Sequence, residues 1–509
     1  MTGAVTTPHP LATEAGMQVL RAGGTAPEAL IAAGAVLAVV MPHFCGLGGD
    51  AVWLVASPKV GARSFLAIGQ GLDRPLPSRP IPLRGPDSIL TSAAVVAGWD
   101  HAFGFARAHL DGRAKWQDLL APAISHAETG FAVTPSQEFW ARFRAAELPT
   151  WHGFAPIFLQ GGAPLRAGAA LRQPALAQTL REIAQDGAQA FYHGALSHRI
   201  VDGLRAAGAV ISRADMARTT CHDAQPLSLP YRGLTLLAPP PPTQGLTTLQ
   251  IMGQLSALDM GSLQAGGGCH IHYCVEAVKR AFLQRHRIAD PAFHAVDVAH
   301  GLAADTLTAL ASDISPQKAM PWPHVWQHGD TVFLGAIDAA GTAASVLQSI
   351  YFDWGSGVVA GDTGIIWQNR GAAFSHDPAH VNAFAPGKLP FYTLNPGIAL
   401  HMGVPKLVYG TQGADGQPQT LAMLLTRMID FGQSPAQALA GPRFLLGRTF
   451  SDSRDSLKLE GDVGASVRAD LTARGHDISV IPAQSPMAGL AGVVQNGPDG
   501  IKAWHDPRV

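Results

Sequence analysis

The sequence predicts an α+β fold in which layers of helix and layers of sheet are stacked on one another. Helical stretches dominate the chain up to about residue 290, whereas short alternating strands separated by Gly, Asp and Asn dominate from residue 331. The chain lacks the regular alternation of strand and helix that is typical of a parallel sheet. With 509 residues, 47% of them hydrophobic, it can bury one large core or two moderate ones.

Two helices are expected near the start. The first begins at Pro10, which suits a first helical turn, and its apolar residues recur at a spacing of four until the Gly-Gly pair at residues 23–24 ends it. The second, "APEALIAAGAVLAVV" at residues 26–40, is apolar on nearly every side. Such a helix has no polar face to turn toward water, so we expect it to be buried.

The middle of the chain mixes further helical stretches with turns. The segments "KWQDLLAPAISHAETGF" and "HYCVEAVKRAFLQRHRIAD" have helical character, and "APPPPTQG" at residues 238–245 interrupts them. Residues 311–330, "ASDISPQKAMPWPHVWQHGD", contain three prolines and no clear period, so they are expected to connect the two parts of the chain. Long connectors inside a compact protein are usually functional or disordered.

Beyond the connector, "TVFLGAIDAAGTAASVLQSIYF" is typical of a β-hairpin. Asp338 and Gly341 provide turn chemistry around Ala340. A turn centred there places Thr331 opposite Ser349, because the two numbers are symmetric about 340. Thr and Ser are common cross-strand partners and β-propensity alone explains them, so the pair needs support from elsewhere in the chain.

Motifs along nearly the whole chain give that support. Near the start stands "GMQVLRAGGTAPEALIAAGAVLAVVMPHFCGLGGD", and the middle holds "WQDLLAPAISHAETGFAV", "APPPPTQGLTTLQ" and "HYCVEAVKRAFLQRHRIADP". The last part holds "GDTVFLGAID", "DWGSGVVAGDTGIIWQNRGAAFS", "TLNPGIAL", "GTQGADGQPQT" and "DFGQSPAQALAGPRF". In this order they resemble the gamma-glutamyltransferase family of N-terminal-nucleophile (Ntn) hydrolases, with a pattern most similar to its oxamate amidohydrolase and cephalosporin acylase-like branch.

The resemblance implies a four-layer αββα sandwich made as a zymogen that cuts itself between Asp330 and Thr331. Residues 1–330 would form a large, helix-rich subunit and residues 331–509 a small one, both intertwined in a single domain as a heterodimer. In such enzymes the threonine hydroxyl attacks an amide carbonyl while its freed α-amine is the base, since the reference pKa of an α-amine, about 8, is nearer neutrality than that of Lys. The sequence leaves open whether two heterodimers associate further.

The same resemblance implies roles for three more residues. Ser349 matches a second hydroxyl that positions the nucleophile, in agreement with the hairpin register. The backbone N–H groups of Gly413 and Ala414, in "GTQGADG", match the donors to the oxyanion, where the family usually has Gly-Gly. Alanine keeps the N–H, and the role is retained if the backbone there does not demand a positive φ.

The substrate pocket departs from that of gamma-glutamyl enzymes. The family's Arg-Glu-x-Ala-Pro segment is replaced by "AIGQGLDRPLP", in which Arg74 could take the place of the arginine. The usual Asn two residues after the second hydroxyl is Tyr351, the usual Gln is Arg370, and the usual ammonium-binding Asp is Ala373. The acid that would hold an α-ammonium is therefore missing.

Together these positions predict a pocket for a carboxylate without a neighbouring ammonium. Arg370 offers a fixed fork suited to a carboxylate, Tyr392 and Thr393 replace the family's paired serines as hydroxyl donors, and Tyr351 would favour a small acyl group. The expected activity is that of an amidohydrolase converting oxamate to oxalate and ammonia. The alternatives are glutathione hydrolysis or gamma-glutamyl transfer, cleavage of a glutaryl (cephalosporin-type) amide in a deeper cavity, and a non-catalytic role in binding or assembly.

Charge and apolar runs limit the partners. The formal net charge is -1 and Lys and Arg form no cluster, so a small-molecule amide is expected as the partner, not nucleic acid or an anionic membrane. The longest apolar run, residues 29–41, is shorter than the roughly 20 residues that cross a bilayer. The N-terminus lacks the pattern of a signal peptide, which predicts a cytoplasmic protein.

No cofactor or metal is expected. Gly46, Gly48 and Gly49 in "CGLGGD" match no nucleotide-binding pattern, and tight packing near the site explains them better. The cluster "CHIHYC" at residues 269–274 lacks the paired spacing of zinc sites and falls on a predicted helix. The four cysteines of this long chain are expected to be reduced, buried thiols.

Overall fold

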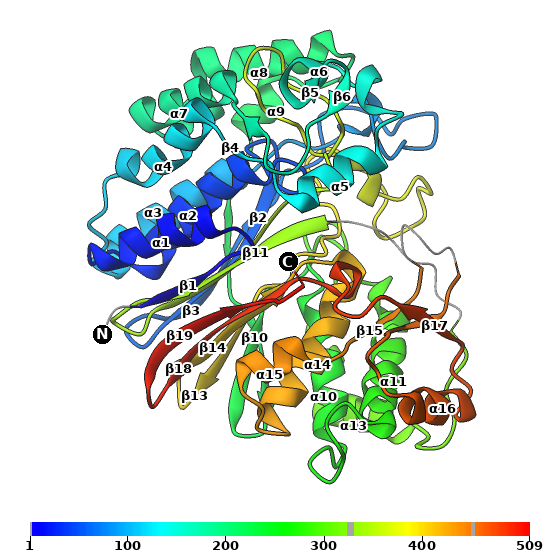
Figure 1. The fold of residues 1–509 in the computed structure, drawn as a ribbon. Coiled ribbons are helices and arrows are strands. Elements are labelled where there is room, and N and C mark those ends of the chain that lie inside the picture. The colour runs from blue at the N-terminus through cyan, green and yellow to red at the C-terminus, as the bar shows by residue number, and fades with distance from the viewer. Residues whose placement is uncertain (1–2, 323–329, 449–453, 509) are drawn as a thin grey trace.

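The computed structural model describes residues 3–322, 330–448 and 454–508, which form four stacked layers in the order helix, sheet, sheet, helix (Figure 1). The two central layers are six-stranded sheets in which all neighbouring strands are antiparallel. The predicted α+β class is thereby confirmed.

Both central sheets take strands from each side of residue 331. The first sheet has the spatial order β1 (Ala4–Thr6), β11 (Asp330–Ile337), β12 (Ala343–Tyr351), β2 (Asp50–Ser57), β3 (Gly61–Ala67) and β8 (His222–Ala224). The second has the order β19 (Gly500–His505), β18 (Ala491–Gly497), β14 (Val404–Thr411), β13 (Gly397–His401), β10 (Leu234–Ala238) and β9 (Leu227–Tyr231). Neither part of the chain could complete its sheets alone.

Helices cover the outer face of each sheet (Figure 1). On the side of the first sheet lie α1 (Pro10–Arg21), α2 (Ala26–Val40), α3 (Val95–His109), α4 (Trp116–Thr129), α5 (Pro135–Phe143), α6 (Ala155–Phe158), α7 (Pro174–Asp186), α8 (Gly194–Ala206) and α9 (Arg213–Ala217). On the side of the second lie α10 (Gly245–Ser256), α11 (Gly268–Arg285), α12 (Val298–Gly301), α13 (Ala304–Ser312), α14 (Gln417–Ile429), α15 (Pro435–Ala440) and α16 (Ala465–Ala473). None of the helices in the described segments is both long and apolar enough to cross a membrane.

Three short sheets complete the described structure. Strands β15 (Phe444–Leu446), β16 (Leu457–Glu460) and β17 (Ile478–Ile481) form one of them. The other two are the pairs β4 (Phe131–Ala132) with β7 (Ala170–Leu171) and β5 (Leu159–Gln160) with β6 (Ala163–Pro164).

The hydrophobic core fills the three spaces between the four layers. In β2, Trp53 belongs to the cluster beneath the first helical layer, whereas its neighbour Val52 belongs to the cluster between the sheets. In β14, Val408 joins the cluster between the sheets and Tyr409 joins the cluster against the second helical layer. Successive side chains of a strand point to opposite faces, so both faces of each sheet are buried.

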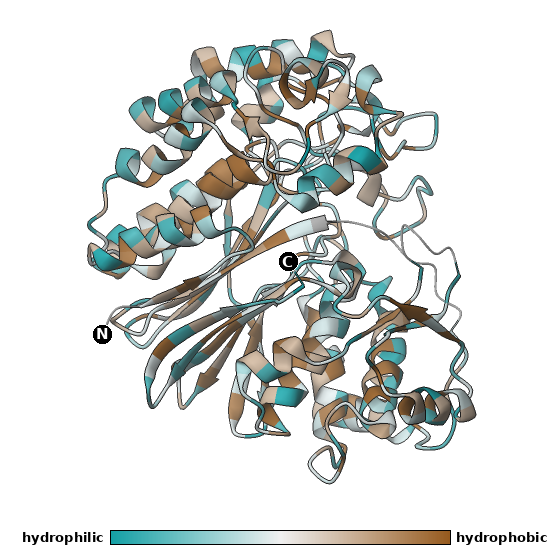
Figure 2. Cartoon of the chain, in the orientation of Figure 1, coloured by the Kyte–Doolittle hydropathy of each residue, from teal (hydrophilic) through white to brown (hydrophobic). Residues whose placement is uncertain are grey.

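The two helices predicted near the start are confirmed. Helix α1 begins at Pro10, and Gly23 follows its end with a φ of 82°. Thr25 and Glu28 form a capping box at the start of α2, and all residues of α2 are buried. Figure 2 shows this helix largely in the colour of apolar residues, beside the first sheet.

The helix-rich first part also contains strands that the sequence did not reveal. Strand β2 is buried along its full length, so its residues "DAVWLVAS" lack the alternation that marks a half-buried strand. The predicted connector is partly helical, because α13 ends at Ser312 within it; residues 313–322 form neither helix nor strand. Its remainder, residues 323–329, lies outside the described residues.

The turn of the β11–β12 hairpin is built around Asp338. One carboxylate oxygen accepts hydrogen bonds from the backbone N–H groups of Ala340 (3.0 Å) and Thr342 (2.9 Å), and the other accepts one from Ala26 (2.9 Å). Gly341 has a φ of 81°, as the predicted turn requires. Because Ala26 begins α2, the same side chain ties the hairpin to the buried helix.

The register predicted for the hairpin is confirmed from Val332, which pairs with Gln348, to Ile337, which pairs with Ala343. At the open end the ladder shifts by one residue, so that Asp330 lies opposite Tyr351. Two residues of β12, at positions 349 and 350, therefore oppose Thr331. This is a β-bulge, a device that re-aims side chains and is common next to active sites.

We expect Asp338→Ala to destabilise the protein, because two buried backbone N–H groups, those of Ala26 and Thr342, would lose their acceptor, as would the more exposed N–H of Ala340. Each such loss costs about 1–3 kcal/mol, so the free energy of unfolding should fall by at least about 2 kcal/mol. Urea unfolding followed by tryptophan fluorescence measures the effect. Asp338→Asn keeps one acceptor oxygen, so its free energy of unfolding should lie between those of the wild type and the alanine variant. An unchanged urea midpoint for Asp338→Ala would contradict the role of Asp338 in the turn.

Candidate active site

The predicted site residues lie at strand ends and in turns where the two sheets meet. Thr331 is the second residue of β11, and Ser349 and Tyr351 lie at the end of β12. Arg370 starts a short 3-10 helix (Arg370–Ala373), Tyr392 and Thr393 precede β13, and Gly413 and Ala414 stand between β14 and α14. All of them are buried except Gly413, which is half-buried.

The hydroxyl of Ser349 is fixed beside the bulge at Thr331. Its Oγ accepts a hydrogen bond from the backbone N–H of Tyr351 at 2.8 Å. A Cβ added to Gly49 would lie 2.3 Å from the carbonyl oxygen of Ser349, so the glycine-rich loop packs directly on this strand. The interpretation of these glycines as close packing near the site is confirmed.

Arg370 is buried between two tyrosine rings. Its guanidinium carbon lies 3.8 Å from the ring centroid of Tyr351 and 3.5 Å from that of Tyr392. The side chain is 1% exposed, and none of its three guanidinium nitrogens has a hydrogen-bond acceptor within the described residues. Two aromatic faces stabilise a desolvated cation, yet a buried charge without hydrogen-bond partners remains costly. A guanidinium in this state is a fork that can bind a planar anion with parallel hydrogen bonds.

Asp50 holds Tyr392 in place. One of its oxygens accepts the Tyr392 hydroxyl at 3.0 Å, and the other accepts the backbone N–H groups of Gly69 and Ala94, both at 2.9 Å. Complete burial raises the pKa of Asp50 to about 6, although these bonds and the charge of Arg370 act in the opposite direction. The side chain orients one of the two rings that enclose the guanidinium and brings a titratable negative charge close to it.

Gln244 joins the pocket to the turn at Gly413 and Ala414. Its buried Nε2 donates to the carbonyl oxygens of Thr393 (2.6 Å) and Ala414 (2.8 Å). The backbone N–H groups of Gly413 and Ala414 donate to no acceptor in the part of the chain that the structure describes. Two such N–H groups in one turn can bind a developing oxyanion.

The sequence prediction required that the backbone at Ala414 should not demand a positive φ, and this condition is not met. The φ of Ala414 is 45°, in the left-handed region, and Gly413 before it has a φ of 120°. The left-handed conformation raises the energy of an alanine by roughly 1–2 kcal/mol, whereas glycine adopts it with little strain. Ala414 therefore keeps the N–H group in a strained backbone. Tyr351 has a φ of 81° and Trp354 one of 59°. Strain of this kind gathers at functional sites, where the surrounding structure maintains it.

A wide cavity of about 1610 Å³ opens from the turn at Gly413 and Ala414. Aromatic side chains line much of it, and Arg84 lies on its border. Arg84 and Arg144 both bind the Asp353 carboxylate, with N···O distances of 2.8 Å. Arg84 lines this cavity together with Arg144, Arg448 and Arg508, whereas Arg74 is not among its lining residues.

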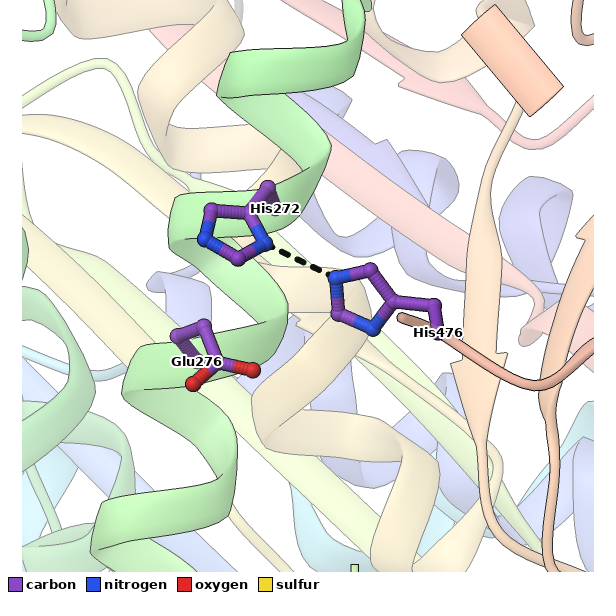
Figure 3. A group of neighbouring side chains, drawn as sticks. All are labelled: His272, Glu276 and His476. Atoms are coloured by element: carbon purple, nitrogen blue, oxygen red, sulfur yellow. Dashed lines mark hydrogen bonds between the residues drawn. The ribbon is translucent and has the colours of Figure 1, made fainter. Parts of the chain in front are cut away.

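The histidine-rich segment contributes to a separate buried cluster. His272 and Glu276 on α11 face His476, and their polar atoms lie within 4.8 Å of one another (Figure 3). Nε2 of His272 lies 2.8 Å from the carbonyl oxygen of Ser315 and must donate to it, which leaves Nδ1 to accept from His476 Nε2 at 2.8 Å. Two histidine nitrogens bound to one zinc ion with Zn–N bonds of about 2.0–2.1 Å would lie about 3.3 Å apart. That separation is longer than a hydrogen bond.

The carboxylate of Glu276 is already neutralised. It binds Lys279 Nζ at 2.8 Å and Arg280 Nη1 at 2.9 Å. Burial and nearby cations lower the pKa of His476 to about 3, so this environment disfavours positive charge. Hydrogen bonds account for the cluster, and no metal role is proposed for it. All four cysteines are free; Cys45 and Cys274 are buried, and the other two are half-buried.

Three residues of the site were missed from the sequence: Asp50, Gln244 and Arg84. Asp50 closes the motif "CGLGGD" and precedes an entirely apolar strand, where an acid has to be hydrogen-bonded. Gln244 follows the proline run of "APPPPTQG", which was interpreted only as a break. Arg84 belongs to a stretch without any period, and its side chain reaches the site through the fold.

The fold and the buried site together define the class of N-terminal-nucleophile hydrolases. The family model of gamma-glutamyltranspeptidase matches residues 12–509. The oxamate amidohydrolase proenzyme of Klebsiella pneumoniae is 43% identical over 99% of this chain and 97% of its own length. A glutathione hydrolase-like proenzyme of Bacillus subtilis, YwrD, is 36% identical over 99% of this chain and 96% of its own length.

Solved structures show the same relationship. Cephalosporin acylase from Bacillus halodurans superposes with a TM-score of 0.90 at 29% identity, covering 100% of this chain and 94% of that one. The gamma-glutamyltranspeptidase of Helicobacter pylori gives a TM-score of 0.59 at 25% identity over 64% of this chain and 95% of that one. The chain belongs to the gamma-glutamyltranspeptidase family. It is a hydrolase that acts on amide C–N bonds.

Proposed function

We propose that the chain is cut between Asp330 and Thr331 and that the mature enzyme hydrolyses oxamate to oxalate and ammonia. The observation that carries the substrate is the buried guanidinium of Arg370, held between two tyrosine rings with its nitrogens free of protein acceptors. A carboxylate is the planar anion that this fork binds with two parallel hydrogen bonds. The similarity to a protein named oxamate amidohydrolase supports the same substrate.

Cleavage would create the base that the reaction needs. The hydroxyl oxygen of Thr331 attacks the carbonyl carbon of Asp330, the C–N bond breaks, and an ester and a free α-amine result. Water then hydrolyses the ester, which leaves a carboxylate on residue 330 and restores the hydroxyl of Thr331. Both central sheets combine strands from 1–330 and 331–509, so the two fragments would stay together as a heterodimer.

In the mature enzyme the α-amine of Thr331 would take the hydroxyl proton as Oγ bonds to the amide carbon of oxamate. Ser349 positions the hydroxyl, and the N–H groups of Gly413 and Ala414 bind the oxyanion. The C–N bond breaks as the proton passes to nitrogen, and ammonia leaves. A water molecule, deprotonated by the α-amine, attacks the resulting ester, releases oxalate and restores the hydroxyl.

The pocket disfavours a gamma-glutamyl group. Ala373 stands where the resemblance places the acid for the α-ammonium, and both oxygens of buried Asp50 already accept hydrogen bonds. Tyr351 and Thr393 enclose the remaining space as buried side chains. A glutaryl amide is the second candidate, because the overall structure is so similar to a cephalosporin acylase. Product release from oxamate, glutamine, a glutaryl amide and glutathione distinguishes the three; we expect oxamate to give the highest kcat/KM.

Thr331→Ala should abolish both cleavage and turnover, because no other group replaces the hydroxyl. Intact-mass analysis of the fresh wild type should give two fragments, residues 1–330 and 331–509, and the variant should stay as one chain. Thr331→Ser retains a hydroxyl and is the matched control, expected to be cut. An uncut wild type that hydrolyses oxamate would refute the scheme.

Arg370→Met should raise the KM for oxamate by about 10- to 100-fold, the range expected when a charge-assisted hydrogen bond of about 1.5–3 kcal/mol is lost. Methionine fills the space between the tyrosine rings without a charge, and self-cleavage should continue because the bulge is untouched. Steady-state kinetics together with a gel of the fragments measure both effects. An unchanged KM would show that the carboxylate binds elsewhere.

The KM for oxamate should rise as the pH increases through about 6, where Asp50 loses its proton. Above that pH its negative charge opposes binding of a second carboxylate beside Arg370; below it Asp50 is neutral and binding is tighter. Asp50→Asn stays neutral at every pH, so its KM should be low and flat between pH 5 and pH 8, from about one unit below the transition to about two units above it. The same dependence of KM on pH in the wild type and in Asp50→Asn would contradict an effect of the Asp50 charge on substrate binding. The pH dependence of kcat, measured in the same experiment, is the internal control.

A further inference from the structure

The turn at Gly413 and Ala414 has a strained conformation. Its φ angles are 120° at Gly413 and 45° at Ala414, and the left-handed region is unfavourable for alanine. The carbonyl oxygen of Gly413 accepts the N–H of Gly416 at 2.6 Å. The carbonyl and the N–H of one trans peptide point in opposite directions, so this bond directs the N–H of Ala414 away from Gly416. Strain of this kind persists only where neighbouring groups hold it.

Gln244 holds the turn through its side-chain amide. The residue is buried and directly precedes α10. Its Nε2 donates one hydrogen to the carbonyl oxygen of Ala414 (2.8 Å) and the other to that of Thr393 (2.6 Å). Both partners only accept, so the atom that faces them must be the amide nitrogen, and both of its hydrogens are used. The backbone N–H of Gln244 donates to the carbonyl of Tyr392 at 2.9 Å, which fixes the point from which the side chain extends.

Arg285 and Asp415 hold the next residue of the same turn. Asp415 follows Ala414 in a short 3-10 helix (Ala414–Gly416), and Arg285 is the last residue of α11. Nη1 of Arg285 lies 2.6 Å from Oδ1 of Asp415, and Nη2 donates to Oδ2 at 2.7 Å. Both side chains are buried, so water screens this two-bond pair less than it would screen a pair at the surface. The pair ties the residue after Ala414 to the end of a long helix.

These contacts form one connected cluster. Nη1 of Arg285 also donates to Oε1 of Gln244 in a longer hydrogen bond of 3.4 Å. We call Gln244, Arg285 and Asp415 the turn cluster. Gly413 and Ala414 themselves line the wide cavity, whereas no member of the turn cluster is among the described residues that line it. The cluster therefore acts on the turn and not on a molecule in the cavity.

We propose that the residues of the turn cluster are positioning residues, which hold the N–H groups of Gly413 and Ala414 where the oxyanion forms. The inference rests on the proposed function, because it takes these two N–H groups as the oxyanion donors. Such donors stabilise the transition state only at about 2.7–3.1 Å from the oxyanion. A turn that relaxes from its strained angles moves them away from that position. Loss of the cluster should lower kcat and change KM little, since the bound substrate carries no oxyanion.

Gln244→Met tests the proposal, because methionine has nearly the volume of glutamine and no donor. Both kcat and KM for oxamate are measured by ammonia release, per cleaved chain as counted by intact-mass analysis. We expect kcat to fall by about 10- to 100-fold, because loss of one oxyanion donor costs about 100- to 1,000-fold and a displaced donor costs less. The KM should stay within about 3-fold of the wild-type value.

Gln254→Met is the matched control on the same helix. Gln254 is buried in α10, and its Nε2 donates to the carbonyl oxygens of Gln250 (3.1 Å) and Ala277 (3.2 Å), neither of which belongs to the turn. The control therefore loses two hydrogen bonds of the same kind. Its urea midpoint should fall while its kcat and KM equal those of the wild type. An equal loss of kcat in the two variants would show a general effect of stability and would overturn the proposal.

Arg285→Lys is the second variant, and it decides the outcome if Gln244→Met fails to fold. Lysine keeps the charge but not the fork that binds both oxygens of Asp415, so kcat should again fall with little change in KM. A wild-type kcat in one variant would remove that residue from the cluster, and a wild-type kcat in both would overturn the proposal. Folded variants that stay uncut would also overturn it, because the bulge at Thr331 is untouched and self-cleavage should continue.

Failure of the proposed function gives a different result. A self-cleaved wild type without oxamate turnover would overturn the substrate alone. The same fall in kcat is then expected on whichever of glutamine, a glutaryl amide and glutathione the wild type hydrolyses. A wild type that neither cuts itself nor hydrolyses any of these amides would overturn both the proposed function and the role of the turn cluster.

Discussion

The pairing of β11 with β12 is the interaction on which the rest of the structure depends. Asp338 fixes the closed end of this hairpin and ties it to α2, and the register that follows brings the bulge at Thr331 to the open end. The same strand places Ser349 beside the bulge and Tyr351 against Arg370. The hairpin is paired with β1 on one side and β2 on the other, and its side chains are buried on both faces of the sheet. Both sets of contacts fix its position. Thr331, buried near the end of such a strand, has little freedom to move.

The pocket holds unfavourable features in place before any substrate arrives. Arg370 is buried with no acceptor among the described residues, and Tyr351 and Ala414 have positive φ angles. These features cost stability, which the large core around them offsets. If the proposed function holds, the cation and the N–H groups of the turn need not reorganise to meet a carboxylate and an oxyanion. Asp50 belongs to this arrangement, because it orients Tyr392 and brings a charge that changes with pH.

The turn at Gly413 and Ala414 lies between two unequal regions. On one side the space is closed by buried side chains around a single cation, and on the other side lies the wide aromatic cavity. Relatives within the family are named for quite different substrates.

The sequence by itself determined the features that depend on local chemistry. Helix boundaries followed from Pro10 and from the cap at Thr25, and the hairpin register followed from the turn at Asp338. The resemblance to the family identified Arg370 as a candidate for the substrate site. The tertiary structure alone decided how distant segments meet. It brought the carboxylate of Asp50 to the hydroxyl of Tyr392, the amide of Gln244 to the carbonyls of Thr393 and Ala414, and Arg84 to the edge of the cavity. It also revealed β2, whose buried faces erase the alternation by which strands are recognised. Local patterns record what each segment prefers, whereas these contacts join residues far apart in the chain and arise only when the four layers pack together.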